Sequence, residues 1–238
     1  MLAPRHCRPR AYEAFLDGLR DMNSPAGLVR AAVAISMHEL ADADPDAVLA
    51  RLQAYAAQVR SSVPTRVDRL MGGSTDANDI EPVLAHLHAI LFDEEGFRGD
   101  RTTYDDPCNS YLPVVLETKR GIPISLTLVY AAVGWQLGLA VRGINAPWHF
   151  LAGIEINGSL TLIDVFDSGR LIRADEALAR IEAMSGGSIP APEEVLPTAG
   201  PRAWISRMLR NLERLFAEAD REKDRVAMVE LAEAMARG

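Results

Sequence analysis

Residues 120–140 read RGIPISLTLVYAAVGWQLGLA, and this stretch decides the fold of the chain. Apolar side chains occur on nearly all sides of a helical projection of it, which is typical of a helix buried in a protein core. Pro123 suits the first turn of such a helix, and Gly138 suits a left-handed C-terminal end. The sequence therefore predicts a buried helix that begins close to Pro123.

The region before this stretch, residues 1–98, is predicted to be helical. SPAGLVRAAVAISMHEL starts with Ser24 as a candidate N-cap and a proline at the first helical position. DPDAVLARLQAYAAQVR repeats this arrangement from Asp44, and its apolar residues recur at helical spacing. A third helical pattern, IEPVLAHLHAILFDEEGF, ends near Gly96.

Two strands are predicted after the buried helix. HFLAGIEIN and LTLIDVF flank Asn157-Gly158, and an Asn-Gly pair between β-like runs is a strong hairpin signal. A two-residue turn places Ile156 opposite Ser159. Side chains alternate along a strand, so His149 and Asp164 then share one face, with Cβ atoms about 7 Å apart.

An aspartate that orients a histidine forms the rear half of a nucleophilic triad, so His149 and Asp164 are candidate catalytic residues. Two plainer interpretations stay open. The residues can be a structural pair that bridges the strands, or the aspartate can serve only the turn that follows it. A register shift of one residue would place the two side chains on opposite faces.

The rest of the chain completes an α+β interpretation. Residues 184–201, rich in Gly, Pro and Ser, are predicted to be a linker, and residues 202–238 a short helical hairpin that resembles a tetratricopeptide pair. The expected domains are 1–98 (helical N-terminal region), 99–183 (a core in which the buried helix packs on a small antiparallel sheet), 184–201 and 202–238.

Composition excludes several classes of protein. The 238 residues carry a formal net charge of −8, which disfavours nucleic acid as a partner. Two cysteines without CxxC spacing argue against a disulfide scaffold or a structural zinc site and fit a reducing cytoplasm. No stretch is apolar for long enough to span a membrane, and no signal peptide is expected.

We expect no metal and no cofactor. His86 and His88 are two apart on a helix and point to different sides, and we expect His6 and Cys7 to lie in a frayed terminus.

Several spaced blocks together resemble the SirB-type transglutaminase-like family: DDPCNSYLPVVLETKRGIPISLTLVYAAVGWQLGL, then APWHFLAGI, then LIDVFDSG. The resemblance covers roughly residues 30–235 and is densest at 92–170. It implies a papain-like, transglutaminase-type core with helices before it and a tetratricopeptide-like tail after it. In active members of the wider superfamily, a Cys opens the buried helix, and a His and an Asp lie on the following strands.

By this resemblance the histidine corresponds to His149 and the aspartate to Asp164, but the nucleophile does not carry over. Gly121-Ile122-Pro123 stands where active relatives have Gly-x-Cys. Proline has neither a nucleophile nor a backbone N–H for an oxyanion hole. Trp148 stands where relatives mostly have Gly, and it would narrow the approach to His149.

Other residues near the helix start are weaker candidates. Ser125 is a tentative nucleophile, although two helical residues turn about 200°, and a first-turn residue that satisfies backbone groups is the plainer interpretation. Asn109 would bind a ligand or, more simply, cap the next helix. Arg120 would bind a carboxylate or phosphate group, or form a surface ion pair. Cys108 is a free thiol in a turn-like stretch.

Two functions follow from these candidates. The first is a non-catalytic transglutaminase-like domain that binds a protein partner or small ligand in a cleft that retains the His–Asp pair. The second is a hydrolase or acyltransferase in which His149 acts as base, Asp164 orients it, and Ser125 or a water attacks. A mainly structural, assembly-forming protein is a third interpretation.

Overall fold

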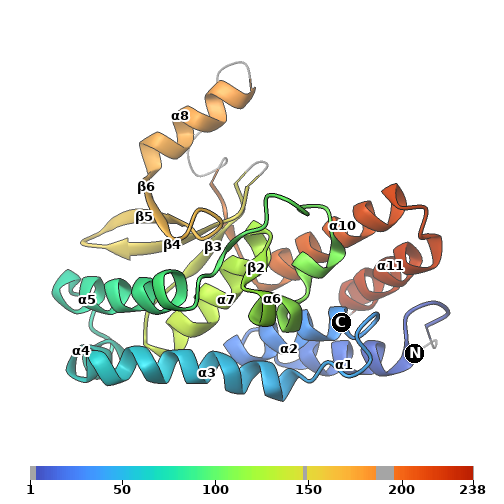
Figure 1. The fold of residues 1–238 in the computed structure, drawn as a ribbon, viewed down its shortest axis with the longest axis horizontal. Coiled ribbons are helices and arrows are strands. Elements are labelled where there is room, and N and C mark those ends of the chain that lie inside the picture. Colours follow the sequence, from blue (N-terminus) through green and yellow to red (C-terminus); the bar gives the residue numbers. More distant parts are fainter. Residues whose placement is uncertain (1–3, 147–148, 186–195, 238) are drawn as a thin grey trace. The chain divides into compact units, whose positions relative to one another are not determined.

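The computed structural model describes residues 4–146, 149–185 and 196–237 (Figure 1). Its helices are α1 (Pro9–Arg20), α2 (Pro25–Ser36), α3 (Pro45–Ser62), α4 (Pro64–Met71), α5 (Ala77–His88), the π-helix η1 (Ala89–Glu94), the 3-10 helix η2 (Pro107–Ser110), α6 (Leu112–Thr118), α7 (Pro123–Gln136), α8 (Ala174–Ser185), α10 (Pro201–Glu218) and α11 (Glu222–Arg237).

The strands are β1 (Arg98–Gly99), β2 (Arg120–Gly121), β3 (Arg142–Ile144), β4 (Leu151–Ile156), β5 (Ser159–Asp164), β6 (Arg170–Arg173) and β7 (Thr198–Ala199). The last five form one antiparallel sheet in the order β6-β5-β4-β3-β7. Helices followed by a small antiparallel sheet and further helices confirm the α+β prediction.

The chain divides into two compact units, and each unit draws on separate stretches of sequence. Unit 1 comprises Met1–Arg51, Asp100–Ser125 and Gly200–Gly238. Unit 2 comprises Leu52–Gly99 and Leu126–Ala199. The domains expected from the sequence are linear segments and do not coincide with these units; as domain boundaries they stay a prediction.

The predicted helix starts are confirmed. The Ser24 hydroxyl accepts a hydrogen bond from the Gly27 N–H at 3.0 Å, and a carboxylate oxygen of Asp44 accepts one from the Asp46 N–H at 2.9 Å. These side chains bind N–H groups in the first turn that have no partner inside the helix.

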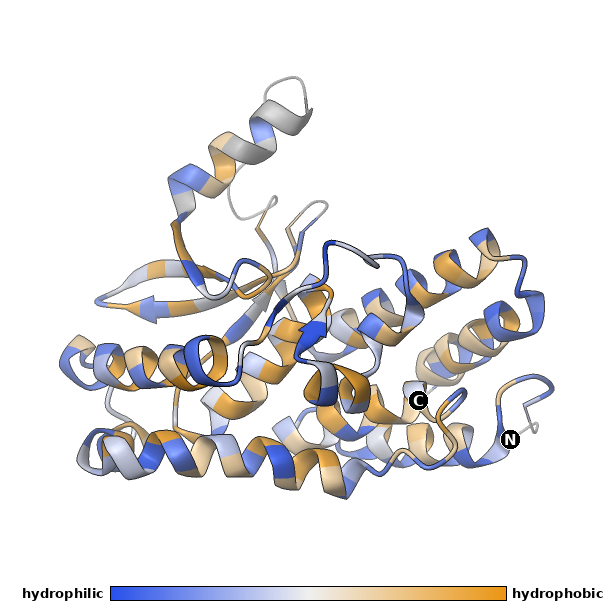
Figure 2. Cartoon of the chain, viewed as in Figure 1, coloured by the Kyte–Doolittle hydropathy of each residue, from blue (hydrophilic) through white to orange (hydrophobic). Residues whose placement is uncertain are grey.

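Helix α7 begins at Pro123 and is buried over its first twelve residues. Figure 2 shows it as one of the most continuously hydrophobic segments of the chain. Gly138 follows it with φ of 81°, the predicted left-handed end. A Cβ at Gly138 would lie 2.7 Å from the Leu70 carbonyl carbon, so both the backbone angle and the close approach of α4 require glycine.

The predicted hairpin is confirmed in register. Ile156 pairs with Ser159, and Asn157 and Gly158 have φ of 52° and 74°, the positive pair that a type I′ turn requires. Strands β3, β6 and β7 complete the sheet and were not predicted. Apolar residues from its strands, from α8 and from the segments after β3 and before β7 form one core cluster: Ile144, Ala146, Leu151, Leu162, Ile172, Ala177 and Leu196.

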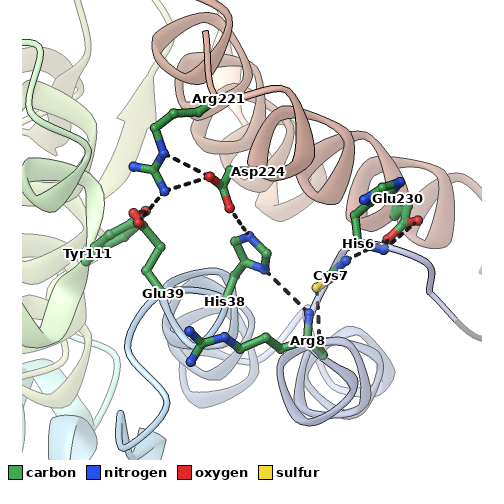
Figure 3. A network of polar contacts seen from close by, with 9 residues as sticks. All are labelled: His6, Cys7, Arg8, His38, Glu39, Tyr111, Arg221, Asp224 and Glu230. Carbon is green, nitrogen blue, oxygen red and sulfur yellow. Dashed lines mark hydrogen bonds and ion pairs between the residues drawn. The ribbon is translucent and has the colours of Figure 1, made fainter. Parts of the chain in front are cut away.

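The two ends of the sequence meet in unit 1 through a polar network (Figure 3). The backbone N–H groups of Arg5, His6 and Cys7 donate to the Glu230 carboxylate at 2.8 to 3.3 Å. His38 contacts Asp224 at 2.8 Å and accepts the Arg8 N–H through Nδ1. The expectation of a frayed terminus at His6 and Cys7 is therefore wrong, because a carboxylate on α11 binds three successive N–H groups there.

The structure describes the predicted linker at 184–201 only at its two ends, and the linker stays a prediction. Its described C-terminal end is not irregular, since Thr198–Ala199 forms β7 and pairs with β3. Residues 186–195 lie outside the described chain. The helical hairpin that follows is confirmed as α10 and α11, and its likeness to a tetratricopeptide pair stays a prediction.

Candidate functional site

The structure brings His149 and Asp164 together, as the hairpin register predicts. Nε2 of His149 lies 3.0 Å from Oδ1 of Asp164. His149 lies just before β4, and Asp164 is the last residue of β5. The aspartate side chain is 11% exposed and the histidine side chain 32%, so a buried carboxylate holds a partly accessible imidazole.

Asp164 also holds the turn that follows it. One carboxylate oxygen accepts the Asp167 N–H at 3.2 Å, and its backbone carbonyl accepts the Gly169 N–H at 2.9 Å. Burial alone would raise the pKa of Asp164, but the His149 contact and the N–H groups of Asp167 and Phe166 outweigh it and hold the pKa below its usual value. The Asp164 carboxylate therefore contacts the histidine and also stabilises the turn.

Phe166 is a neighbour of His149, as the hairpin register predicts, but the packing of Gly99 against it was not predicted. The two rings meet edge-on, with centroids 6.3 Å apart. Gly99 lies against the same phenylalanine: a Cβ there would be 2.4 Å from the ring, and the Gly99 N–H donates to the Phe166 carbonyl at 2.9 Å. Only one sign of this packing is present in the sequence, which is Gly99 in the stretch FRGD, 67 positions before Phe166.

The residues at the start of α7 belong to unit 1 and form a second group. Pro123 is buried at the first position of the helix. Ser125 is fully buried, and its hydroxyl donates to the Asn109 carbonyl at 2.6 Å and lies 3.1 Å from the Ile122 carbonyl. The same hydroxyl accepts the Ile122 N–H at 3.2 Å. Ser125 thus ties the α7 start to the η2 segment.

Asn109 does not cap α6, contrary to the simpler expectation. Helix α6 begins at Leu112 after Tyr111, which makes no side-chain cap, and the Asn109 amide instead donates to the Thr103 carbonyl at 2.6 Å. The side chain closes the loop before η2, and Asn109 is 6% exposed.

Arg120 and Trp148 complete the expected ligand-binding set. Nη1 of Arg120 is buried and has no hydrogen-bond partner within the described chain. A buried N–H donor without an acceptor is costly, and an anionic ligand would satisfy it. Trp148 lies outside the described residues.

Cys108 is not an activated thiol. Burial and, after it, the hydrogen bond and charge of Asp106 raise its pKa to about 11. A thiol with a raised pKa holds its proton at neutral pH, whereas nucleophilic cysteines have a lowered pKa.

No group of three or more His, Cys, Asp or Glu side chains in the described chain is placed to hold a metal ion. His88 instead contacts the Tyr130 hydroxyl at 2.9 Å, and burial lowers its pKa.

A buried helix followed by an antiparallel hairpin with a His–Asp pair defines the class of protein. The family model described as transglutaminase-like superfamily matches residues 46–210, and the chain belongs to this superfamily. The resemblance to its SirB-type branch is confirmed by bacterial relatives.

A UPF0162 protein of Xylella fastidiosa strain 9a5c is 30% identical over 198 residues, which cover 82% of this chain and 66% of that protein. A UPF0162 protein of Pseudomonas aeruginosa is 28% identical over 209 residues, 87% of this chain and 70% of that protein. F-box only protein 21 of Mus musculus matches over 85 residues at 36% identity, 36% of this chain and 14% of that protein. The chain thus spans just under two thirds of the Xylella relative.

No solved structure matches the chain. Among the described helices, none combines the length and the apolar character needed to cross a bilayer.

Proposed function

We propose that this protein is a non-catalytic transglutaminase-like domain protein that binds a protein partner or small ligand through the His149–Asp164 pair. The observation that carries the proposal is the bonding of Ser125. Its hydroxyl is fully buried and engaged with two carbonyls and one N–H of the backbone, which suits a structural role.

Pro123 adds to this argument. It occupies the helix position where active relatives carry the cysteine, and it is itself buried. Neither cysteine of the chain replaces that nucleophile, because the pKa values of Cys7 and Cys108 are raised to about 12 and about 11.

Two features favour a retained binding role. In unit 2 the His149 side chain is 32% exposed beside a buried carboxylate; separately, in unit 1, Nη1 of Arg120 is a buried donor to which the described residues supply no acceptor. The net charge of −8 argues against nucleic acid as the partner, and a cytoplasmic location is part of the same proposal.

The second candidate is a hydrolase or acyltransferase in which His149 activates a water. The lowered pKa of Asp164 favours it, because a carboxylate that stays ionised would stabilise the imidazolium formed during proton abstraction.

A covalent-probe experiment separates the two. The full chain is incubated with fluorescent ester, thioester and activated-amide probes, and adducts are measured by intact mass beside His149→Ala, Ser125→Ala and Cys108→Ala variants. The proposal expects no His149-dependent adduct and no His149-dependent release of product from the wild type. An adduct on Ser125 or Cys108 that disappears in His149→Ala, or turnover that does so, would overturn it.

A further inference from the structure

One segment of unit 2, residues 89–99, contacts the turn between β5 and β6 at two places. At the first, the ring of Phe92 lies against Gly169, where an added Cβ would be 2.1 Å from a ring carbon. At the second, Gly99 packs against the Phe166 ring, and its N–H donates to the Phe166 carbonyl at 2.9 Å. The segment therefore holds this turn from both ends.

The turn in question holds both the backbone and the side chain of Asp164. The Gly169 N–H donates to the Asp164 carbonyl at 2.9 Å, and the Asp167 N–H donates to one of its carboxylate oxygens at 3.2 Å. Gly169 is buried and has φ of 77°, a conformation that glycine adopts at no steric cost. A displacement of Gly169 would therefore move the carboxylate that lies 3.0 Å from His149.

Phe92 is itself held by two aromatic neighbours. Its ring stacks on that of Tyr130, with centroids 6.1 Å apart and an angle of 11° between the planes. It meets the His88 ring edge-on, with centroids 5.2 Å apart. His88 also contacts the Tyr130 hydroxyl at 2.9 Å. Because Tyr130 is fully buried on α7, these contacts attach Phe92 to the buried helix.

The backbone around Phe92 is not α-helical. Residues 89–94 form the π-helix η1, and the Glu95 N–H donates at 2.9 Å to the carbonyl of Ile90, five positions earlier. Such turns are rare and occur frequently at functional sites. Since a π turn contains one extra residue, the chain leaves η1 in a different direction from a continued α-helix, and here it leads to Gly99.

We propose that Phe92 is a positioning residue for the His149–Asp164 pair. Its ring, attached to α7, fixes Gly169 and thereby keeps the Asp164 carboxylate against the imidazole. The consequence for binding rests on the proposed function, because it matters only if His149 meets a ligand. The positioning itself is measurable in the free protein, so its failure would leave the proposed function standing.

A double-mutant cycle in the full chain tests the positioning. Phe92→Leu keeps an apolar side chain but removes the ring that lies on Gly169, and Asp164→Asn removes the charge. Substitutions at independent sites have additive effects on stability. We expect Asp164→Asn to lower the urea midpoint at pH 7 by at most about half as much in the Phe92→Leu background as in the wild type. Equal shifts in both backgrounds would overturn the proposal. Phe92→Met, which also removes the ring, replaces Phe92→Leu in the cycle if that variant does not fold.

Hydrogen–deuterium exchange followed by NMR separates positioning from a general loss of stability. In Phe92→Leu the Asp167 and Gly169 N–H groups should exchange faster by a factor about fivefold larger than the N–H groups that pair β4 with β5. Val59→Ala, at a fully buried position on α3 in the same unit, is the control. It should speed both groups evenly and leave the effect of Asp164→Asn unchanged. An even acceleration in Phe92→Leu would show that Phe92 adds only general stability, and would overturn the proposal.

Discussion

His149 and Asp164 lie 3.0 Å apart across a hairpin whose turn is Asn157-Gly158. The exposed fraction is about three times larger for the histidine side chain, 32% against 11%. This asymmetry is what a histidine needs if it is to meet a ligand while a carboxylate fixes its orientation. The same contact predicts that the charge of Asp164 stabilises the folded protein.

Asp164→Asn should destabilise the protein by about 1–3 kcal/mol at pH 7, because the amide keeps the shape but loses the charge that meets His149. The pKa of Asp164 is lowered from 3.8 in the folded chain, so its contribution is present above that value and is lost as pH falls through the lower folded pKa. Urea unfolding at pH 7 and at pH 3 measures both effects.

The matched control is Asp68→Asn, whose side chain is 69% exposed and forms a 3.4 Å surface pair with Arg60. That variant should change stability little at either pH. An equal loss for Asp164→Asn at pH 7 and at pH 3 would show that the loss does not come from the charge of the carboxylate.

The Ser125→Ala substitution tests whether the Ser125 hydroxyl has a structural role. The substitution leaves the Ile122 N–H without its side-chain acceptor and removes the bond to the Asn109 carbonyl, so we expect a loss of about 1–3 kcal/mol. Thermal unfolding followed by circular dichroism should show a Tm lower by several degrees.

Ser36→Ala is the control for this measurement. Ser36 is also fully buried, but within the described part of the chain its hydroxyl makes one bond, to the Val33 carbonyl of its own helix. Ser125→Ala should therefore cost more than Ser36→Ala. A Ser125→Ala protein as stable as the wild type would remove the structural explanation for the serine.

The predictable parts of the fold are those encoded by neighbours in sequence. The Asn157-Gly158 turn gave the register that brings His149 to Asp164, and Pro123 and Gly138 gave both ends of α7. Strand β7 was missed because its two residues, Thr198 and Ala199, form a strand only through pairing with β3. Short segments of this kind take their conformation from distant partners, which local propensity does not contain.

The same limit applies to the site. The contact between Gly99 and the Phe166 ring joins positions 67 apart, and no periodicity connects them. The ordered N-terminal segment depends on Glu230, 223 positions after Cys7. A polar, basic terminus gives no local sign that a distant carboxylate will bind its N–H groups.

Glu230→Gln should loosen that segment. The amide loses the charge that three successive N–H groups share, and charge-assisted hydrogen bonds are the stronger kind. Hydrogen–deuterium exchange at pH 7 should be faster at Arg5, His6 and Cys7. Glu233→Gln, at a 60% exposed position on the same helix, should leave those amides unchanged. Equal exchange in both variants would show that the segment is held by other contacts.

Cys7 should be nearly inert to alkylation at pH 8 in the folded protein. Burial, followed by the negative charge of Glu230, raises its pKa to about 12, so little thiolate is present, and the residue is 3% exposed. Cys108 is more exposed and its pKa is about 11, so it should react first with iodoacetamide, as peptide mass mapping over time would show. Glu230→Gln should speed the labelling of Cys7, because it removes a charge that disfavours the thiolate and loosens the segment around it. Labelling of Cys108 in that variant should keep the wild-type rate, and faster labelling at both cysteines would indicate general unfolding in place of the local effect.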